Sequence, residues 1–200
     1  MYPPRFGLFL LPNDVREAVT AARRAEDDGY YSVSVNDHFY SPFGGPRTPQ
    51  LECFTVLTAM AMVTRRVKLA PAVVAASFRS PALLAKCATT LDHASDGRLI
   101  LGLGAGWQVE EHAAYGFDLP APGPRVTRFA EAIEIVHRLF REDSVNFHGT
   151  SFRLTDAPFG PKPVNGTLPL LVGTGSPRML RLTARWAEEW NTWGDPAEVK

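Results

Sequence analysis

The residues most suited to chemistry lie in three short stretches, each directly after a run of apolar residues. In the first, Asp37 and His38 follow the apolar run at 31–35. Imidazole titrates near neutral pH, which makes His38 the candidate for proton transfer. Neighbouring side chains on an extended backbone diverge, so Asp37 and His38 need not bond each other. The alternative is a loop histidine that bonds a backbone carbonyl.

The second stretch, RLILGLGAGW (98–107), has glycine at 102, 104 and 106. A dinucleotide fingerprint needs G-x-G-x-x-G, and Trp107 stands at its sixth position, so that pattern fails. No Gly-Lys-Ser/Thr sequence indicates a Walker loop. Glycine has no Cβ and leaves room for a flat ligand or for a neighbouring backbone. The residues alone leave both interpretations open.

The third stretch, Gly173 to Ser176, precedes a helix expected to begin at Pro177, since proline is favoured at the first helical position. Backbone N–H groups at a helix N-terminus suit a phosphate, and a plain turn with a helix cap is the alternative. No histidine or cysteine spacing is typical of a metal site, so we expect no metal. Cys53 and Cys87 are expected to be two buried thiols.

The elements that must position these residues alternate between apolar strands and helices. We expect strands over 6–11, 31–35, 67–76, 98–105, 168–173 and 189–194. We expect helices over 13–29, 53–64, 81–95, 109–116, 127–142 and 177–187, with a small hairpin insertion near 144–154 and the start of a further unit at 195–200. This alternation is typical of α/β folds with a parallel sheet.

Two α/β architectures compete, a doubly wound open sheet and a (β/α)8 barrel of the TIM type. The first would place a glycine loop after the first strand, but LPNDVRE (11–17) has no glycine. The stretches suited to chemistry instead follow the second, fourth and fifth strands, as in a barrel. A complete barrel needs about 250 residues. We therefore predict that residues 1–200 form a single domain, an incomplete barrel of five to six βα units.

Composition excludes several classes of protein. The chain has 21 Lys+Arg and 21 Asp+Glu, so its formal net charge is zero and no basic surface points to nucleic acid or to a membrane. The apolar run at 6–11 is too short for a signal segment or a membrane span. We expect a cytoplasmic protein with a small-molecule ligand.

In combination, these motifs resemble the luciferase-like monooxygenase superfamily. The resemblance rests on DH (37–38), FRSPALLAK (78–86), DGRLILGLGAGW (96–107), EEHAAYGFDLP (110–120), LPLLVGTG (168–175) and RLTARWAEEWN (181–191). It is strongest to the oxidoreductases that use the deazaflavin coenzyme F420. It implies a (β/α)8 barrel that transfers hydride to or from a small organic substrate, in a family where homodimers are common. The alternatives are an FMN-dependent monooxygenase that uses O₂ and a shortened, non-catalytic flavin-binding protein.

The resemblance also implies residue roles. His38 corresponds to the family's active-site histidine and Asp37 to its partner near the cofactor. A cis peptide bond is implied between Ala72 and Val73, behind the deazaflavin ring. The remaining cofactor-lining residues are implied to be Gly104, Ala105 and Gly106, whose glycines would give the ring clearance, and Gly173, Thr174, Gly175 and Ser176, near the phosphate-bearing tail.

Two positions depart from the family's sugar-phosphate dehydrogenases. Trp107 stands where those enzymes carry a glutamate that serves as an acid, and Pro42 stands where they carry a tryptophan, with Phe43 next. We therefore assign Phe43 and Trp107 to the substrate pocket and do not expect a sugar phosphate. Glu110 and Glu111 are expected to be surface residues of the short helix.

Overall fold

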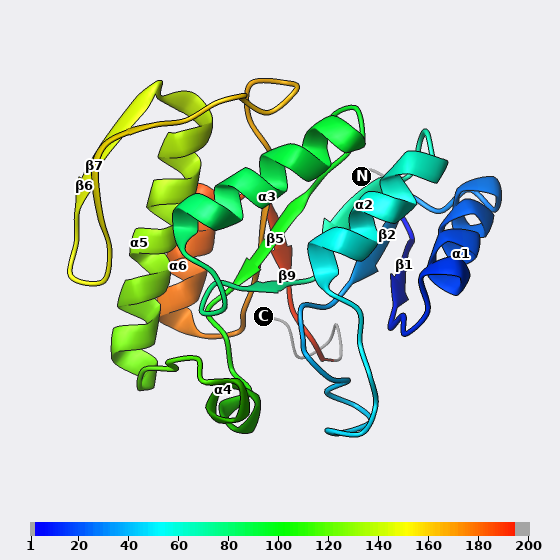
Figure 1. The fold of residues 1–200 in the computed structure, drawn as a ribbon, viewed down its shortest axis with the longest axis horizontal. Helices are drawn as coiled ribbons and strands as arrows, with labels where there is room; N and C mark the ends of the chain where they lie inside the picture. The colour runs from blue at the N-terminus through cyan, green and yellow to red at the C-terminus, as the bar shows by residue number, and fades with distance from the viewer. Residues whose placement is uncertain (1–2, 195–200) are drawn as a thin grey trace.

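The computed structural model describes residues 3–194 as an α/β fold with parallel strands in sequence order (Figure 1). The strands of the sheet are β1 (Gly7–Leu10), β2 (Ser32–Val35), β3 (Lys68–Pro71), β4 (Val74–Ala75), β5 (Leu101–Gly104), β8 (Leu170–Gly173) and β9 (Glu189–Asn191). One ladder joins β1, β2 and β3, and a second joins β4, β5, β8 and β9. A parallel bridge between Leu69 and Leu99 connects the two ladders. The predicted parallel α/β architecture is confirmed.

The predicted strand at 67–76 is divided into β3 and β4, which pair with different neighbours. Pro71 at the end of β3 pairs with Val35 of β2, whereas Val74 of β4 pairs with Leu103 of β5. The two residues between them form a bulge at which the chain changes its partner strand. An apolar run cannot reveal this division, because both halves are largely buried.

The helices are α1 (Val15–Asp27), α2 (Cys53–Val63), α3 (Pro81–Ala94), α4 (Val109–Tyr115), α5 (Pro122–Arg141) and α6 (Pro177–Trp186). Side-chain hydrogen bonds cap the N-termini of several helices. Asp14 accepts hydrogen bonds from two N–H groups of α1, and the Ser80 side chain, which precedes Pro81, accepts one from the N–H of Leu83 in α3. The start of α5 was predicted wrongly, because it begins at Pro122 and not at residue 127. Prolines fit the first helical turn, where N–H groups lack helical partners.

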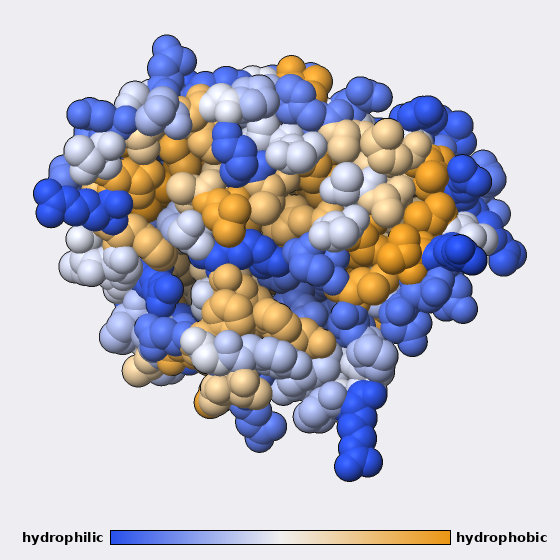
Figure 2. Space-filling model, viewed as in Figure 1, coloured by the Kyte–Doolittle hydropathy of each residue, from blue (hydrophilic) through white to orange (hydrophobic). Residues whose placement is uncertain are grey.

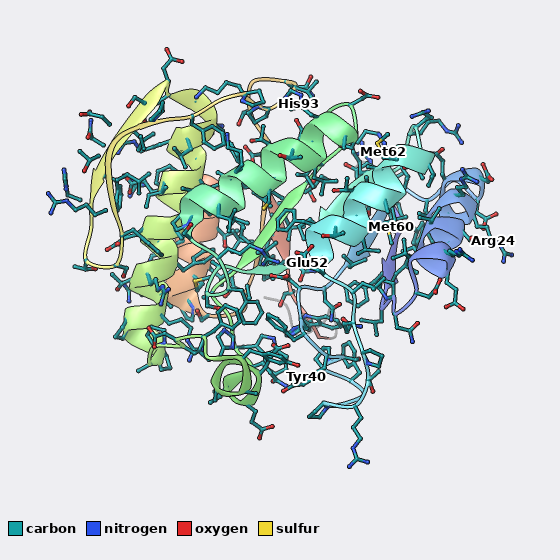
Figure 3. All side chains as sticks on the ribbon, viewed as in Figure 1. Arg24, Tyr40, Glu52, Met60, Met62 and His93 are labelled. Atoms are coloured by element: carbon teal, nitrogen blue, oxygen red, sulfur yellow. The ribbon has the colours of Figure 1, made fainter. Side chains whose placement is uncertain are left out.

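The strands and the inner faces of the helices form one apolar core. Along α2, for example, Met60 is fully buried while Met62 is exposed (Figure 3). Arg98 is a buried cation at the start of the fourth unit, and its guanidinium donates to the carbonyl oxygens of Ala61, Thr64, Val67 and Ser95. Three of these carbonyls lie at the ends of α2 and α3, where the helix dipole favours a cation.

A hairpin, β6 (Ser144–His148) and β7 (Arg153–Pro158), follows α5 and extends beyond the predicted end at residue 154. The Glu131 carboxylate of α5 holds its tip by accepting hydrogen bonds from the N–H groups of Thr150, Ser151 and Phe152. Hydrophilic residues cover this hairpin and α1 at the two edges of the face in Figure 2.

The carboxyl ends of the parallel strands point toward one end of the molecule, the lower end in Figure 1. The loop after β2 and the short helix α4 after β5 lie together there. The predicted strand at 189–194 is present as β9, and the predicted unit at 195–200 lies outside the described residues. This arrangement gathers loops that are far apart in sequence.

Candidate active site

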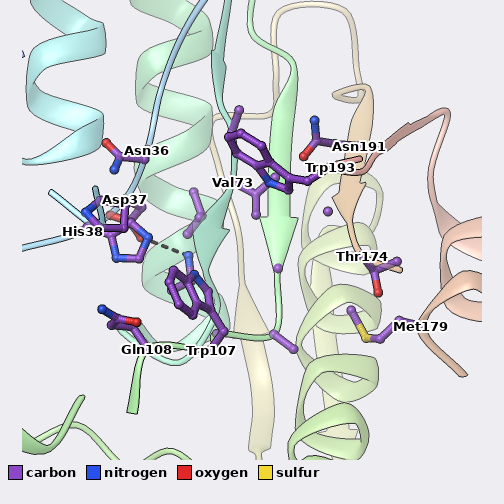
Figure 4. A pocket seen from close by; sticks show the side chains of 18 of the residues that line it. Asn36, Asp37, His38, Val73, Trp107, Gln108, Thr174, Met179, Asn191 and Trp193 are labelled. Atoms are coloured by element: carbon purple, nitrogen blue, oxygen red, sulfur yellow. Dashed lines mark hydrogen bonds between the residues drawn. The ribbon is translucent and has the colours of Figure 1, made fainter. Parts of the chain in front are cut away.

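The loops at the carboxyl ends of the strands enclose a cavity of about 680 Å³. Figure 4 shows His38 and Trp107 at one end of it and Thr174 and Met179 at the other, with Val73 between. Every site residue predicted from the sequence lines this cavity: Asp37, His38, Phe43, Ala72, Val73, Gly104, Ala105, Gly106, Trp107, Gly173, Thr174, Gly175 and Ser176. Tertiary structure therefore brings the three predicted stretches to one place, and their individual roles stay predictions.

His38 is held by a residue that the sequence reasoning misplaced. Its Nδ1 lies 2.7 Å from Oε2 of Glu111, and Oε1 of the same carboxylate accepts a hydrogen bond of 2.7 Å from the N–H of Phe39. Glu111 is 0% exposed, so its assignment to the helix surface was wrong. Its neighbour Glu110 is exposed, as expected. The sequence does not indicate whether Glu110 or Glu111 faces inward, because that depends on how α4 packs against the neighbouring loops.

Asp37 and His38 do not bond each other, in agreement with their predicted divergence. The Asp37 carboxylate instead accepts two hydrogen bonds from Arg79, at 2.6 and 2.9 Å, and one from the N–H of Ala75. Burial raises the pKa of Asp37, and the bonds from Arg79 and Ala75 oppose that rise. Arg79 also bonds Glu52, which caps the start of α2 (Figure 3). Asp37 thus ties the cavity wall at β4 to Arg79, a residue that sequence reasoning did not single out.

The bulge between β3 and β4 forms the inner wall, and the peptide bond between Ala72 and Val73 is cis, as the resemblance implied. The Val73 side chain fills space that glycines leave open. A Cβ placed on Gly104 would lie 2.8 Å from a methyl of Val73, and one on Gly173 would lie 3.0 Å from both methyls. The Val73 side chain therefore occupies the space beside Gly104 that we assigned to a cofactor ring.

The other two glycines of the RLILGLGAGW stretch also have reasons within the chain. A Cβ on Gly102 would collide with the backbone carbonyl of Pro71 in β3. Gly106 has a φ of 84°, in the region that favours glycine, and a Cβ there would lie 2.6 Å from the hydroxyl of Ser77. The residues alone left two interpretations of these glycines open, room for a flat ligand and room for a neighbouring part of the chain. The second explains glycine at both 102 and 106, because neighbouring chain atoms approach closely there.

The loop from Gly173 to Ser176 leads into α6 at the opposite end of the cavity from His38. Its backbone is fixed by hydrogen bonds from the N–H of Thr174 to the carbonyl of Asn191 and from the indole of Trp190 to the carbonyl of Thr174. Around Gly175 there is open space for an additional Cβ. A fixed loop with an open side before a helix suits a bound anion.

Arg125 and Asn36 are among the lining residues that were not predicted. Arg125 of α5 is held by the carbonyls of Pro120 and Gly106, at 2.9 and 3.0 Å, and places a cation at the cavity wall. Asn36 at the end of β2 is buried, and neither atom of its amide has a hydrogen-bond partner among residues 3–194. Asn36 directly precedes the predicted site residue Asp37, whereas nothing in the sequence near Arg125 pointed to the cavity.

Aromatic side chains surround the opening. Trp107 is 59% exposed and meets the His38 ring edge to face, with centroids 5.8 Å apart. Phe43 and Trp193 are 66% and 73% exposed, with ring centroids 6.1 Å apart. Phe43 and Trp107 both line the cavity, and their assignment to a substrate pocket stays a prediction.

Metal-binding clusters and membrane-spanning helices are both absent from the described part of the chain. Residues 3–194 contain no cluster of three or more His, Cys, Asp or Glu side chains that could hold a metal ion. In the same range, no helix has the length and apolar character needed to cross a membrane. Cys53 is a buried free thiol as predicted, whereas Cys87 is only partly buried.

The fold and site define an α/β protein with parallel strands and a cavity of ligand size at the carboxyl ends of those strands. The profile described as "Luciferase-like monooxygenase" matches residues 3–200, so the chain belongs to the luciferase-like monooxygenase family.

Individual relatives agree with this assignment. The chain is 33% identical, over 172 residues, to an F420-dependent glucose-6-phosphate dehydrogenase of Amycolatopsis mediterranei, covering 85% of this chain and 51% of that protein. A solved F420-dependent secondary alcohol dehydrogenase with an F420–acetone adduct superposes with a TM-score of 0.85 at 25% identity, covering 96% of this chain and 58% of that one. A monooxygenase of Streptomyces bottropensis superposes with a TM-score of 0.79 at 28% identity, covering 91% and 57%. The chain spans about half the length of the curated relatives it matches.

Proposed function

We propose that this protein is an oxidoreductase that uses coenzyme F420 to transfer hydride to or from a small organic substrate. The observation that carries the proposal is the single cavity that joins His38, the bulge at Ala72 and Val73, and the loop from Gly173 to Ser176. The names of the relatives support the choice of F420 over FMN.

The cavity residues fit a flat cofactor with a phosphate-bearing tail. The cavity volume of about 680 Å³ is of the size that ligand pockets typically have. The bulge and the segment 104–106 would support the ring. Arg125 and the N-terminus of α6 would hold the phosphate, because a guanidinium and the backbone N–H groups of a first helical turn are donors that suit phosphate. The unpartnered amide of Asn36 offers both a donor and an acceptor to a polar group of the ligand.

Each group has a limited task in this proposal. The cofactor, when bound, carries the hydride chemistry, and the protein supplies orientation and electrostatics. His38 would hold or accept the proton of the substrate oxygen at the open end of the cavity. Trp107 and Phe43 would shape the space for the substrate beside His38 and exclude water from it.

The proposal also covers the domain organisation, the oligomeric state and the location of the protein. Residues 1–200 would be a single domain with the first five to six βα units of the barrel, and the hairpin near 144–154 would be an insertion. A cytoplasmic homodimer that acts on a small molecule belongs to the same proposal, since homodimers are common in the family. FMN is the alternative cofactor.

Fluorescence titrations of the purified protein with coenzyme F420 and with FMN test the proposal. We expect micromolar binding of F420. The variant Arg125→Met should weaken that binding about 10-fold to 100-fold, since a hydrogen bond to a charged group contributes about 1.5–3 kcal/mol. Micromolar FMN binding without F420 binding would overturn the choice of cofactor. Tight flavin binding without any redox turnover would indicate a non-catalytic binding protein.

A further inference from the structure

Glu111 is a buried carboxylate whose two oxygens have different partners. Oε1 accepts from the backbone N–H of Phe39, and Oε2 lies 2.7 Å from Nδ1 of His38. Residue 111 is 0% exposed, whereas the side chain of His38 keeps 12% of its surface open at the cavity. The carboxylate therefore lies behind the imidazole ring, on the side away from the ligand space.

This contact fixes the proton on the ring of His38. With Glu111 ionised, its carboxylate only accepts hydrogen bonds, so the short contact with Nδ1 places the hydrogen on Nδ1. A neutral imidazole has one N–H, and its other nitrogen is then an acceptor. With Nδ1 as the donor to Glu111, Nε2 has a lone pair available to a donor in the cavity. Neutral His38 is thus set up to accept a proton rather than to give one.

The carboxylate cannot easily move, because neighbouring contacts fix α4. His112, the next residue, is buried and has Nδ1 2.7 Å from the carbonyl of Gln108 and Nε2 2.7 Å from the hydroxyl of Ser77. Ser77 follows the bulge strand β4, and Phe39 follows β2, so α4 is attached to two separate loops. Consecutive residues of one short helix therefore set its rotation, and with it the direction of Glu111.

We propose that Glu111 is a positioning residue that holds His38 in the tautomer with hydrogen on Nδ1, so that Nε2 is a proton acceptor at the cavity. This proposal rests on the proposed function only for its catalytic consequence. A substrate oxygen that donates to Nε2 can pass its proton to the ring: the O–H bond breaks, an N–H bond forms at Nε2, and the resulting imidazolium keeps its hydrogen bond to Glu111. The arrangement favours the direction in which a hydroxyl group loses its proton.

The variant Glu111→Gln gives a specific prediction, because an amide has only one acceptor oxygen. The N–H of Phe39 is a fixed donor and takes that oxygen, which leaves the NH₂ group facing Nδ1 of His38. Nδ1 must then accept, and the hydrogen moves to Nε2. The exposed neighbour supplies a matched control, Glu110→Gln, which removes the same charge from the same turn without touching His38.

Two-bond ¹H–¹⁵N correlation spectra of the ligand-free protein report the tautomer directly, with the His38 ring identified by its loss in His38→Gln. We expect the hydrogen on Nδ1 in the wild type and in Glu110→Gln, and on Nε2 in Glu111→Gln. Turnover of Glu111→Gln should fall about 10²-fold or more, as for loss of general acid–base catalysis.

A hydrogen on Nε2 of neutral His38 in the wild type, or an unchanged tautomer in Glu111→Gln, would overturn the proposal. The wild-type spectrum shows whether the hydrogen of neutral His38 lies on Nδ1 or on Nε2. The proposal can therefore be refuted even if the Glu111→Gln variant folds poorly. No cofactor is present in the measurement. Failure to bind F420 would therefore refute the proposed function and leave the tautomer result intact.

Discussion

Replacing Gly102 by alanine would test whether the glycines of β5 serve the packing of the chain. An added Cβ at residue 102 would lie closer than 3.0 Å to the carbonyl oxygen of Pro71, a separation that real Cβ atoms essentially never show. It would also lie 3.2 Å from a methyl of Val73. The carbonyl belongs to the backbone of β3 and cannot rotate away, so β3 and β5 would have to separate.

The expected cost follows from this geometry. Overpacking of a core costs about 1–3 kcal/mol, and contact with backbone puts Gly102→Ala at the upper end, about 3 kcal/mol. For a chain of this size, each kcal/mol lowers Tm by about 2–4 °C, so Tm should fall by about 6–12 °C. In urea the midpoint should fall by about 1 M or more, given a slope of about 1–3 kcal/mol/M. Tryptophan fluorescence and far-ultraviolet circular dichroism would follow both transitions.

Gly123→Ala is the matched control for this experiment. Gly123 lies in the first turn of α5 and has no atom within 4 Å of an added Cβ. The stability of Gly123→Ala should therefore stay within about 0.5 kcal/mol of the wild type. A free energy of unfolding for Gly102→Ala that also changes by no more than about 0.5 kcal/mol would refute the packing explanation. The glycines would then have to be explained by a ligand.

Two shorter predictions concern a catalytic group and an acid-sensitive contact. His38→Ala should lower steady-state turnover about 10²-fold or more, while His148→Ala, in the exposed hairpin, should not change it; near wild-type rates for His38→Ala would remove His38 from the mechanism. Burial raises the pKa of Glu131, but hydrogen bonds from Thr150, Ser151 and Phe152 leave it below its ordinary value of 4.5. A lowered folded-state pKa means that this anchoring is present above 4.5 and is lost as the pH falls through the folded value. Hydrogen-exchange protection at 150–152 should drop in that range and should show no such step in Glu131→Gln; an identical pH dependence in both proteins would contradict this.

The position of the site was readable from the sequence because of how parallel strands are connected. In an α/β fold the carboxyl ends of the strands share one end of the sheet, so residues just after successive strands converge. His38, Gly104 to Trp107, and Gly173 to Ser176 each follow an apolar run, and all of them line one cavity. Periodicity also placed the helices, apart from the start of α5, where two prolines resembled a loop.

The contacts around the site could not be read in this way. Glu110 and Glu111 are chemically identical neighbours, and only the docking of α4 on the loops after β2 and β4 buries one and exposes the other. Arg79 lies 42 residues from Asp37 in the chain, so no local pattern reports their ion pair. The side chain that fills the space left by Gly104 and Gly173 comes from Val73, on the bulge that divides the predicted third strand.

The amino-acid sequence by itself determined the alternation of strands and helices, the end of the sheet that bears the site, and the residue types gathered there. These follow from local periodicity and from chain connectivity, which a single sequence contains. The tertiary structure alone decided which carboxylate holds His38 and which arginine pairs with Asp37. It also decided that the Val73 side chain fills the space beside Gly104 and Gly173. Those outcomes depend on the relative rotation and distance of elements far apart in the chain, and small differences in packing settle them.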